Sequence, residues 1–187
     1  MQRKARAWCA VAVLAATIPG PVAASSFDDD EEPGTLWAKV PSVLADVQRR
    51  FGTAARIMSL EIHAEETVIA VQDPAVPAHV DRHTYAANGG VESEPLAVGR
   101  NERRIRAQLF RVSEVDLAVL PRILAAAPAA VDTEGGTVRH AILARTEGMG
   151  ESESWGAPRW RVYVEGPRGG GYVEYGLDGA RKRVTRW

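Results

Sequence analysis

The sequence reads VPSVLA at residues 40–45 and LPRILA at residues 120–125, an offset of 80 positions. A second pair of similar segments follows in the same order, Tyr-Ala-Ala-Asn-Gly from Tyr85 and Tyr-Gly-Leu-Asp-Gly from Tyr175, at an offset of 90. Two matches in one order indicate a tandem duplication whose second half is about ten residues longer. We therefore expect the same order of elements in both halves.

The first half has the pattern of a helix followed by antiparallel strands. Apolar residues recur at positions 40, 44, 47 and 51, with Pro41 suited to the first turn and Gly52 to the position just after the helix. Met58, Leu60 and Ile62 then alternate with polar residues, which predicts a half-buried strand. Further strands are expected at 67–72, at 79–86 and from Val91, with Asn88-Gly89 as a hairpin turn and Pro95 at a sheet edge.

The second half repeats this plan. A helix is expected to carry Leu117, Leu120, Ile123 and Leu124 as far as Pro128, with its regular part beginning or kinking at Pro121. Strands are expected at 137–146, 159–165, 172–177 and 181–186. The sequence thus predicts an α+β fold of two tandem units, each a helix packed on an antiparallel sheet of about four strands. The first unit spans 36–99 and the second spans 113–187, and a basic connection at 100–112 joins them.

The N-terminal residues predict export. Arg3, Lys4 and Arg6 precede an apolar stretch, and Ala24 is a small residue after which a signal peptidase is expected to cut, so 1–24 is interpreted as a signal peptide. An uncleaved anchor is the alternative, and the Pro-Gly-Pro run at 19–21 disfavours it. The acidic stretch 25–35 is expected to be a disordered leader.

Charge and cysteine content exclude several classes of protein. The chain has 23 basic and 24 acidic residues, which gives no reason to expect a nucleic-acid partner. Cleavage would leave 20 basic against 24 acidic residues, no cysteine and no membrane span. A disulfide scaffold and a cysteine nucleophile are then excluded.

The helix openings at Val40-Pro41 and Leu120-Pro121, together with the turns that follow Tyr85 and Tyr175, resemble tandem PepSY-like and β-lactamase-inhibitor-protein-like folds. The resemblance covers about residues 36–187. It implies a periplasmic or secreted, non-catalytic module that binds or inhibits a protein partner. The inhibitor-type members carry disulfides, which the mature chain lacks.

One strand suggests a different function. His79, Asp81, His83 and Tyr85 would share a strand face, and two imidazoles with a carboxylate are possible ligands of a divalent metal. A metal-binding or metal-dependent periplasmic protein is therefore the alternative, although positions i and i+4 of a strand lie about 13 Å apart, which is too far for one ion. His140 is expected on an apolar face with Val138 and Ile142.

The residues give no support for an enzyme or a cofactor. The segment 150–154 only mimics the Gly-x-Ser-x-Gly motif, because it lacks the closing glycine. The glycine-rich stretch 166–171 joins two expected strands, so we interpret it as a flexible hairpin connection and not as a phosphate loop. Two basic stretches, at 100–106 and 181–186, are interpreted as a soluble linker and a charged edge strand, with a patch that binds an anion or an acidic partner as the alternative.

The expected binding surface lies in the second half. The extra residues of this half fall at 147–158 and include Trp155, which has no periodic pattern to bury it. In the next strand, Arg161, Tyr163 and Glu165 would lie on the face opposite Trp160, Val162 and Val164. The predicted protein-binding residues are therefore Trp155, Arg161, Tyr163 and Glu165. The alternative for Trp155 is a plug over the core.

Overall fold

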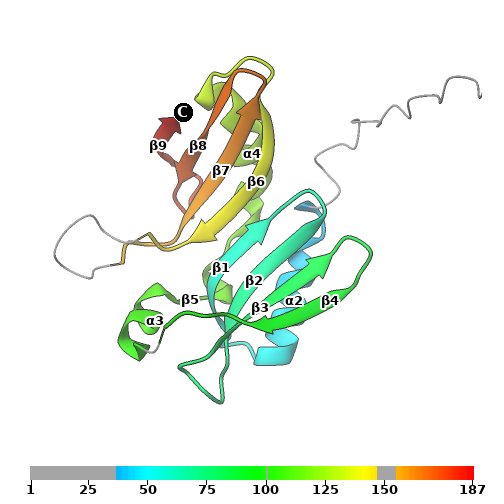
Figure 1. Cartoon of the computed structure of the whole chain (residues 1–187), viewed down its shortest axis with the longest axis vertical. Helices are drawn as coiled ribbons and strands as arrows, with labels where there is room; N and C mark the ends of the chain where they lie inside the picture. The colour runs from blue at the N-terminus through cyan, green and yellow to red at the C-terminus, as the bar shows by residue number, and fades with distance from the viewer. Residues whose placement is uncertain (1–36, 100, 147–154) are drawn as a thin grey trace, which may run out of the picture. The chain divides into compact units, whose positions relative to one another are not determined.

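The computed structural model describes residues 37–99, 101–146 and 155–187 (Figure 1). The predicted signal peptide and acidic leader, and most of the insertion at 147–158, lie outside these residues. The helices are α2 (Val40–Phe51), α3 (Glu102–Gln108) and α4 (Leu120–Val131), with 3-10 turns η1 (Val112–Glu114) and η2 (Leu117–Val119). The strands are β1 (Arg56–Ile62), β2 (Glu66–Gln72), β3 (Val80–Ala86), β4 (Val91–Pro95), β5 (Phe110–Arg111), β6 (Thr137–Ala144), β7 (Arg159–Gly166), β8 (Gly169–Tyr175) and β9 (Arg181–Arg186).

Within the described residues, the fold is a mixed α/β arrangement around one antiparallel sheet of nine strands. The strand order is β4-β3-β2-β1-β6-β7-β8-β9, and the short β5 pairs with β1. The pairing of β1 with β6 lies at the middle of this order and places Leu60 opposite Leu143, both fully buried. On one side of this pairing lie the four strands that follow α2, and on the other side the four that follow α4.

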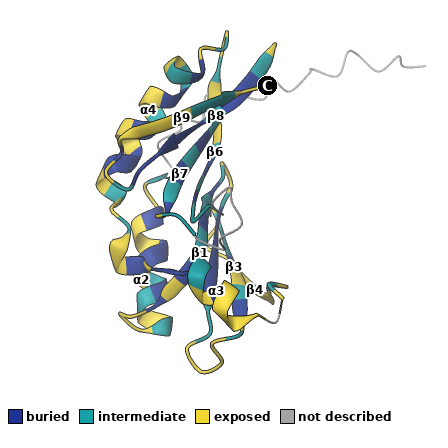
Figure 2. Cartoon of the chain, turned by 90° about the vertical axis from the view of Figure 1, so that its left-hand side faces the viewer, coloured by how far each residue is buried: buried dark blue, intermediate teal, exposed yellow. Residues whose placement is uncertain are grey.

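Helices α2 and α4 lie on the same side of the sheet (Figure 2). Val43 and Val47 of α2 and Ile123 and Ala127 of α4 belong to one buried apolar cluster, together with Trp160 of β7. Full burial of each large apolar side chain contributes about 1.5–3 kcal/mol. The cluster is continuous across the middle of the sheet, so the two helices share one core.

The sequence pattern placed α2 correctly. Pro41 stands in the first turn and Gly52 follows Phe51 with φ 86°, a backbone conformation that favours glycine. For α4, the prediction that the regular helix begins near Pro121 is confirmed: η2 precedes it, and Asp116 accepts a hydrogen bond from the Ala118 backbone N–H.

The predicted end of α4 at Pro128 is wrong, because the helix continues to Val131. A proline removes one backbone donor, and close to the C-terminal end this affects only the last turn. Burial of Ala127 and Val131 holds that turn on the sheet, and Asp132 closes it with φ 59°.

A β-bulge changes the face of one predicted core residue. The pairing of β1 with β2 shifts between Ile57 and Ser59, so that Ile57 and Leu60 are fully buried on the helix side. Met58 instead packs against the small second cluster formed by Ala70, Val80, Ile105 and Leu109. Regular alternation placed Met58 with Leu60, and the bulge corrects this.

The predicted basic connection is structured from Asn101 to Val112. Asn101 caps α3 by accepting a hydrogen bond from the Arg104 backbone N–H, and Ile105 is fully buried in the second cluster. The basic side chains of α3 are exposed. The linker interpretation missed this helix because a single apolar residue in a basic stretch gives no periodic signal.

The glycine-rich stretch is part of a strand and not a flexible connection. Strand β8 begins at Gly169 and pairs with β7 through Gly170 and Gly171, whereas the predicted strand began only at residue 172. A Cβ at Gly171 would overlap the carbonyl oxygen of Thr185 and lie 3.1 Å from Val131. Glycine is needed here because β9 and α4 approach the β8 backbone closely.

Candidate functional site

The two sides of β7 differ sharply in character. Trp160, Val162 and Val164 are fully buried under the helices, and the residues that alternate with them point to the other side. We call this other side of β6–β9 the outer face; its residues used below are His140, Arg159, Arg161, Tyr163, Glu165, Tyr172 and Glu174. The prediction that Arg161, Tyr163 and Glu165 lie opposite the apolar residues is confirmed, and their role in binding stays a prediction.

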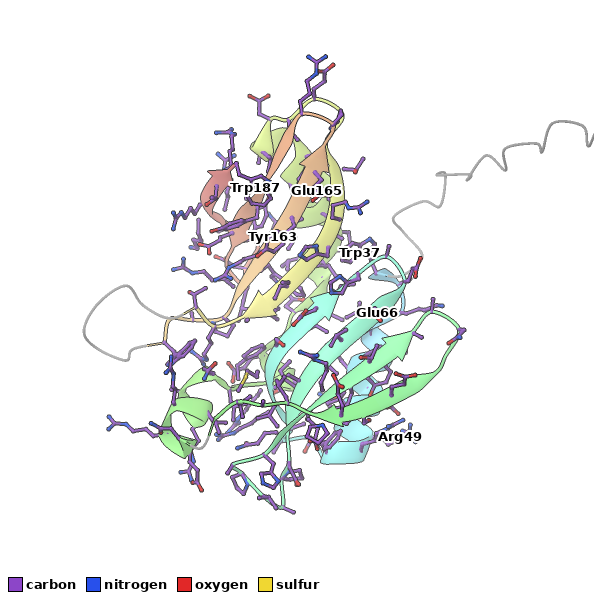
Figure 3. The ribbon with its side chains drawn as sticks, in the orientation of Figure 1. Trp37, Arg49, Glu66, Tyr163, Glu165 and Trp187 are labelled. Carbon is purple, nitrogen blue, oxygen red and sulfur yellow. The ribbon has the colours of Figure 1, made fainter. Side chains whose placement is uncertain are left out.

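A row of aromatic rings crosses the outer face. His140 lies between His63 and Tyr163, with ring centroids 5.1 Å and 4.2 Å away and nearly parallel planes. Tyr163 continues to Tyr172 at 5.3 Å, and Trp187 lies 6.5 Å from Tyr163 and 6.2 Å from Tyr172. Figure 3 labels Tyr163, Glu165 and Trp187 in this part of the sheet. The row brings together residues from β1's end, β6, β7, β8 and the C-terminus.

Sequence reasoning missed most of this row. His140 was expected with Val138 and Ile142 on one apolar face, but the pairing of β6 with β7 shifts between Val138 and His140. This bulge places Val138 against the core and His140 opposite Tyr163. If the glycines had been assigned to the strand, a hairpin turn at 167–168 would have placed Tyr172 opposite Tyr163.

A cluster of arginines borders the row. Glu174 is buried, and its carboxylate accepts hydrogen bonds from Arg161 Nε at 3.2 Å and Arg159 Nη1 at 3.4 Å. Arg183 lies directly opposite Glu174 on β9. Glu165 pairs separately with Arg139 at 3.1 Å. Two guanidinium groups therefore share one carboxylate on the outer face.

Trp155 is half-buried at a single-residue β-bridge just before β7. The adjoining chain is fixed to the end of β6, because Gly156 N–H donates to the Thr146 carbonyl at 3.1 Å and Arg145 Nη1 donates to the Gly156 carbonyl at 2.9 Å. The role of Trp155 as a binding anchor stays a prediction, which replacement of this residue by alanine tests.

The strand face that carries His83 and Tyr85 is turned toward α2, where Phe51 lies against His83 and Asp46 binds Tyr85. His79 precedes β3 and is exposed, whereas His83 is only 6% exposed, with Nδ1 2.7 Å from Ser93 Oγ and the Phe51 ring 5.1 Å away. Burial lowers the pKa of His83. In the described part of the chain, no group of three or more His, Cys, Asp or Glu side chains is placed to hold a metal ion.

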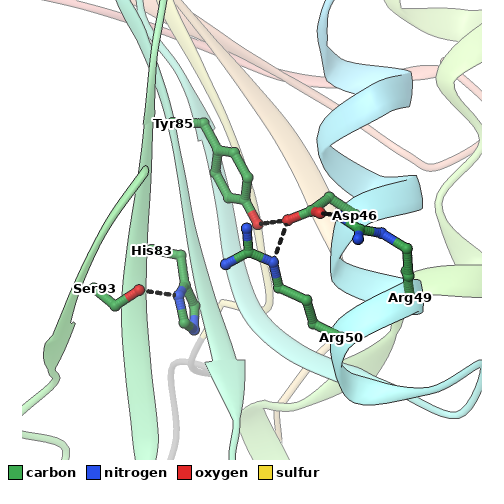
Figure 4. Close-up of polar contacts among 6 residues, drawn as sticks. All are labelled: Asp46, Arg49, Arg50, His83, Tyr85 and Ser93. Atoms are coloured by element: carbon green, nitrogen blue, oxygen red, sulfur yellow. Dashed lines mark hydrogen bonds and ion pairs between the residues drawn. The ribbon is translucent and has the colours of Figure 1, made fainter. Parts of the chain in front are cut away.

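Asp46 of α2 connects the helix to β3 (Figure 4). Its carboxylate accepts a hydrogen bond from Tyr85 Oη at 2.9 Å and pairs with Arg50 at 2.6 Å and with Arg49. Burial opposes ionisation, but the Tyr85 hydrogen bond and the two arginines hold the pKa of Asp46 below its ordinary value. Burial and the same hydrogen bond raise the pKa of Tyr85 to about 12. The hydrogen-bond donors and acceptors of this network are matched, so we interpret the network as a structural link between α2 and β3.

An apolar groove lies on the helix side of the sheet. A groove of about 720 Å³ runs between the start of α2 and α4, and its walls are almost wholly apolar, including Trp37, Leu124 and Pro128. It lies on the opposite side of the sheet from the outer face, so it provides an independent surface for comparison.

The comparisons with known proteins support the fold alone. No family model and no curated protein matches the chain. A solved structure from Clostridium difficile 630, named "putative lipoprotein", is similar with a TM-score of 0.52 and 10% sequence identity, over 79% of this chain and 92% of that one. No helix among the described residues is both long and apolar enough to span a membrane.

Proposed function

We propose that this chain is an exported, non-catalytic module that binds or inhibits a protein partner through its outer face. The observation that carries the proposal is the row of rings from His63 to Trp187, which lies on the side of the sheet that α2 and α4 leave uncovered. Export is supported by the N-terminal pattern of residues 1–24 and by the name of the clostridial neighbour. Its place of action would be the periplasm or the exterior of the cell.

The outer face has the composition of a protein-recognition surface. Tyr, Trp and Arg are enriched where protein partners meet and supply most of the strong contacts. Here Tyr163, Tyr172 and Trp187 pack against one another, and Arg161 lies two residues from Tyr163 on the same face of β7. Rings that already pack against one another lose little side-chain freedom on binding, which lowers the entropic cost of association.

The proposal includes the architecture of tandem units. The order of a helix followed by four strands recurs on each side of the β1–β6 pairing, as expected for two duplicated units fused along that pairing. The resemblance to the PepSY-like and β-lactamase-inhibitor-protein-like folds stays a prediction, and it agrees with a binding role.

Photo-cross-linking in the source cell tests the proposed function. The full chain would carry the photoreactive residue p-benzoylphenylalanine in place of Tyr163, and a matched chain would carry it in place of Ala125, which lines the apolar groove on α4. We expect one defined protein adduct from position 163 and none of that mass from position 125. No adduct at 163, or the same adduct from both positions, would contradict the proposal.

A further inference from the structure

The arginine cluster of the outer face has more positive charge than its own carboxylate neutralises. Arg159 and Arg161 both bind Glu174, and Arg183 faces the same residue from β9. The nearby Glu165 lies against Arg139. One carboxylate therefore balances a group of three arginines, and the cluster is locally cationic in a chain that is acidic after cleavage.

The two bound guanidinium groups also have unused hydrogen-bonding capacity. Each guanidinium carries five N–H donors, and Glu174 occupies one donor of each. The side chains of Arg159 and Arg161 are 39% and 32% exposed, whereas that of Glu174 is 8% exposed. The internal carboxylate thus lies beneath the arginines and holds them in place, and their remaining donors can be reached from outside.

The setting of the cluster favours a carboxylate from a protein. Planar guanidinium groups match carboxylates through paired N–H donors. Arg161 lies two residues from Tyr163 on the same strand face, so an incoming acidic side chain would have an aromatic surface beside it. An acidic residue next to an apolar one fits both features.

We propose that the protein partner places an Asp or Glu side chain on Arg159 and Arg161, with its neighbouring apolar group against Tyr163. This inference rests on the proposed function and specifies the chemistry of the partner. Glu174 then has two effects: it holds both arginines in position, and its own negative charge weakens their attraction for the incoming carboxylate.

Selection from a random peptide library displayed on phage tests the inference, with the mature wild-type chain as bait. The selected peptides would then be titrated against three variants with retained melting temperature: Arg161→Gln, Glu174→Gln and, as a control, Arg168→Gln. Arg168 lies at the tip of the β7–β8 hairpin and is 83% exposed. The Arg168→Gln variant therefore removes the same charge at a site away from the cluster. If Arg161→Gln fails to fold, Arg161→Lys replaces it, because it keeps a cation beside Glu174.

We expect peptides enriched in an acidic residue beside an aromatic or aliphatic one. Their binding should weaken about tenfold or more in Arg161→Gln, or by a smaller factor in Arg161→Lys, which loses the fork of donors. It should strengthen several-fold in Glu174→Gln, stay unchanged in Arg168→Gln and weaken with salt.

The contrary results separate this inference from the proposed function. Peptides without acidic enrichment, or peptides that bind Arg161→Gln as tightly as wild type, would overturn the acidic partner. If those peptides still lose binding when Tyr163 is replaced by alanine, the outer face remains the binding surface. If their binding depends on neither Arg161 nor Tyr163, or no peptide is selected, both proposals are contradicted.

Discussion

His83 is a buried histidine whose ionisation opposes folding. Its ring lies under α2, beside Phe51 and Ser93, and Asp81, Arg50 and Asp46 are the charged groups around it. Burial is the largest influence and lowers its pKa below 6.5. The unfolded chain therefore takes up this proton at a higher pH than the folded chain does.

Replacement of His83 by glutamine should reduce the sensitivity of the fold to acid. The stability that neutral His83 contributes is fully present above pH 6.5 and is lost as the pH falls below that value. Each unit by which the pKa is lowered corresponds to about 1.4 kcal/mol. Urea unfolding on both sides of pH 6.5 measures this, and we expect a smaller loss in His83→Gln than in wild type. An equal loss in both would show that other groups, such as His140, cause the whole effect.

Trp155 allows a second test on a single side chain. We predict that Trp155→Ala weakens binding of the partner with little change in melting temperature, because the side chain is only half-buried and the adjoining Gly156 is already hydrogen-bonded to the end of β6. A binding titration and a thermal melt of the same preparation measure both effects. A loss of about 3 kcal/mol or more in stability, with binding intact, would identify the ring as a plug.

The faces of single residues were predictable only where the strands are regular. Arg161 and Tyr163 were placed correctly because β7 alternates without interruption between residues 159 and 165. Met58 and His140 were misplaced because each lies at a bulge, and an extra residue in a strand leaves no mark in a pattern of period two. The aromatic row depends on one of these bulges, so it could not be read from alternation.

Among the elements, β8 owes its position to glycines. Gly170 and Gly171 pair with Glu165 and Val164 of β7, and β9 lies against them on the other side. The sequence pattern assigned them to a loop because glycine usually interrupts strands. Their small size instead allows Tyr172 and Glu174 to take their places on the outer face.

Gly171→Ala should therefore destabilise the protein by about 1–3 kcal/mol, through forced movement of β9 and Val131. Gly156→Ala is the matched control, because a Cβ there would have no neighbour closer than 3.8 Å. Chemical denaturation of both variants measures the difference. Equal stability of the two variants would contradict the close packing described for β8.

The helices α2 and α4 were predictable because each carries an apolar stripe and a proline in its first turn. Helix α3 was not, since Ile105 alone anchors it. The order of the strands in the sheet could not be predicted from the sequence pattern either. Periodicity shows which residues face a core, but it does not determine which strand lies beside which, and so it left the number of sheets open.

At the scale of the described chain, the β1–β6 pairing joins both halves into one sheet with one core. We expect the mature protein to unfold in a single cooperative transition, since neither half can expose its side of the β1–β6 pairing without uncovering Leu60 or Leu143. Differential scanning calorimetry should give equal calorimetric and van't Hoff enthalpies. Two separate transitions would show that the halves are independent domains.

Because the sheet and its core are continuous across both halves, the described chain has two distinct sides. Helices α2 and α4 cover one side over their shared core, and the outer face on the other side presents the rings and arginines of β6–β9. The proposed binding therefore uses a surface that the folded chain already presents.

The most direct test is the dissociation constant of the cross-linked partner for Tyr163→Ala, measured by titration against wild type. Tyr85→Ala serves as the control, because Tyr85 lies on the helix side of the same sheet and is also half-buried. We expect Tyr163→Ala to weaken binding about tenfold or more, and Tyr85→Ala to lower stability while leaving the affinity of the folded protein unchanged. An unchanged affinity in Tyr163→Ala would show that the partner does not bind through the outer face.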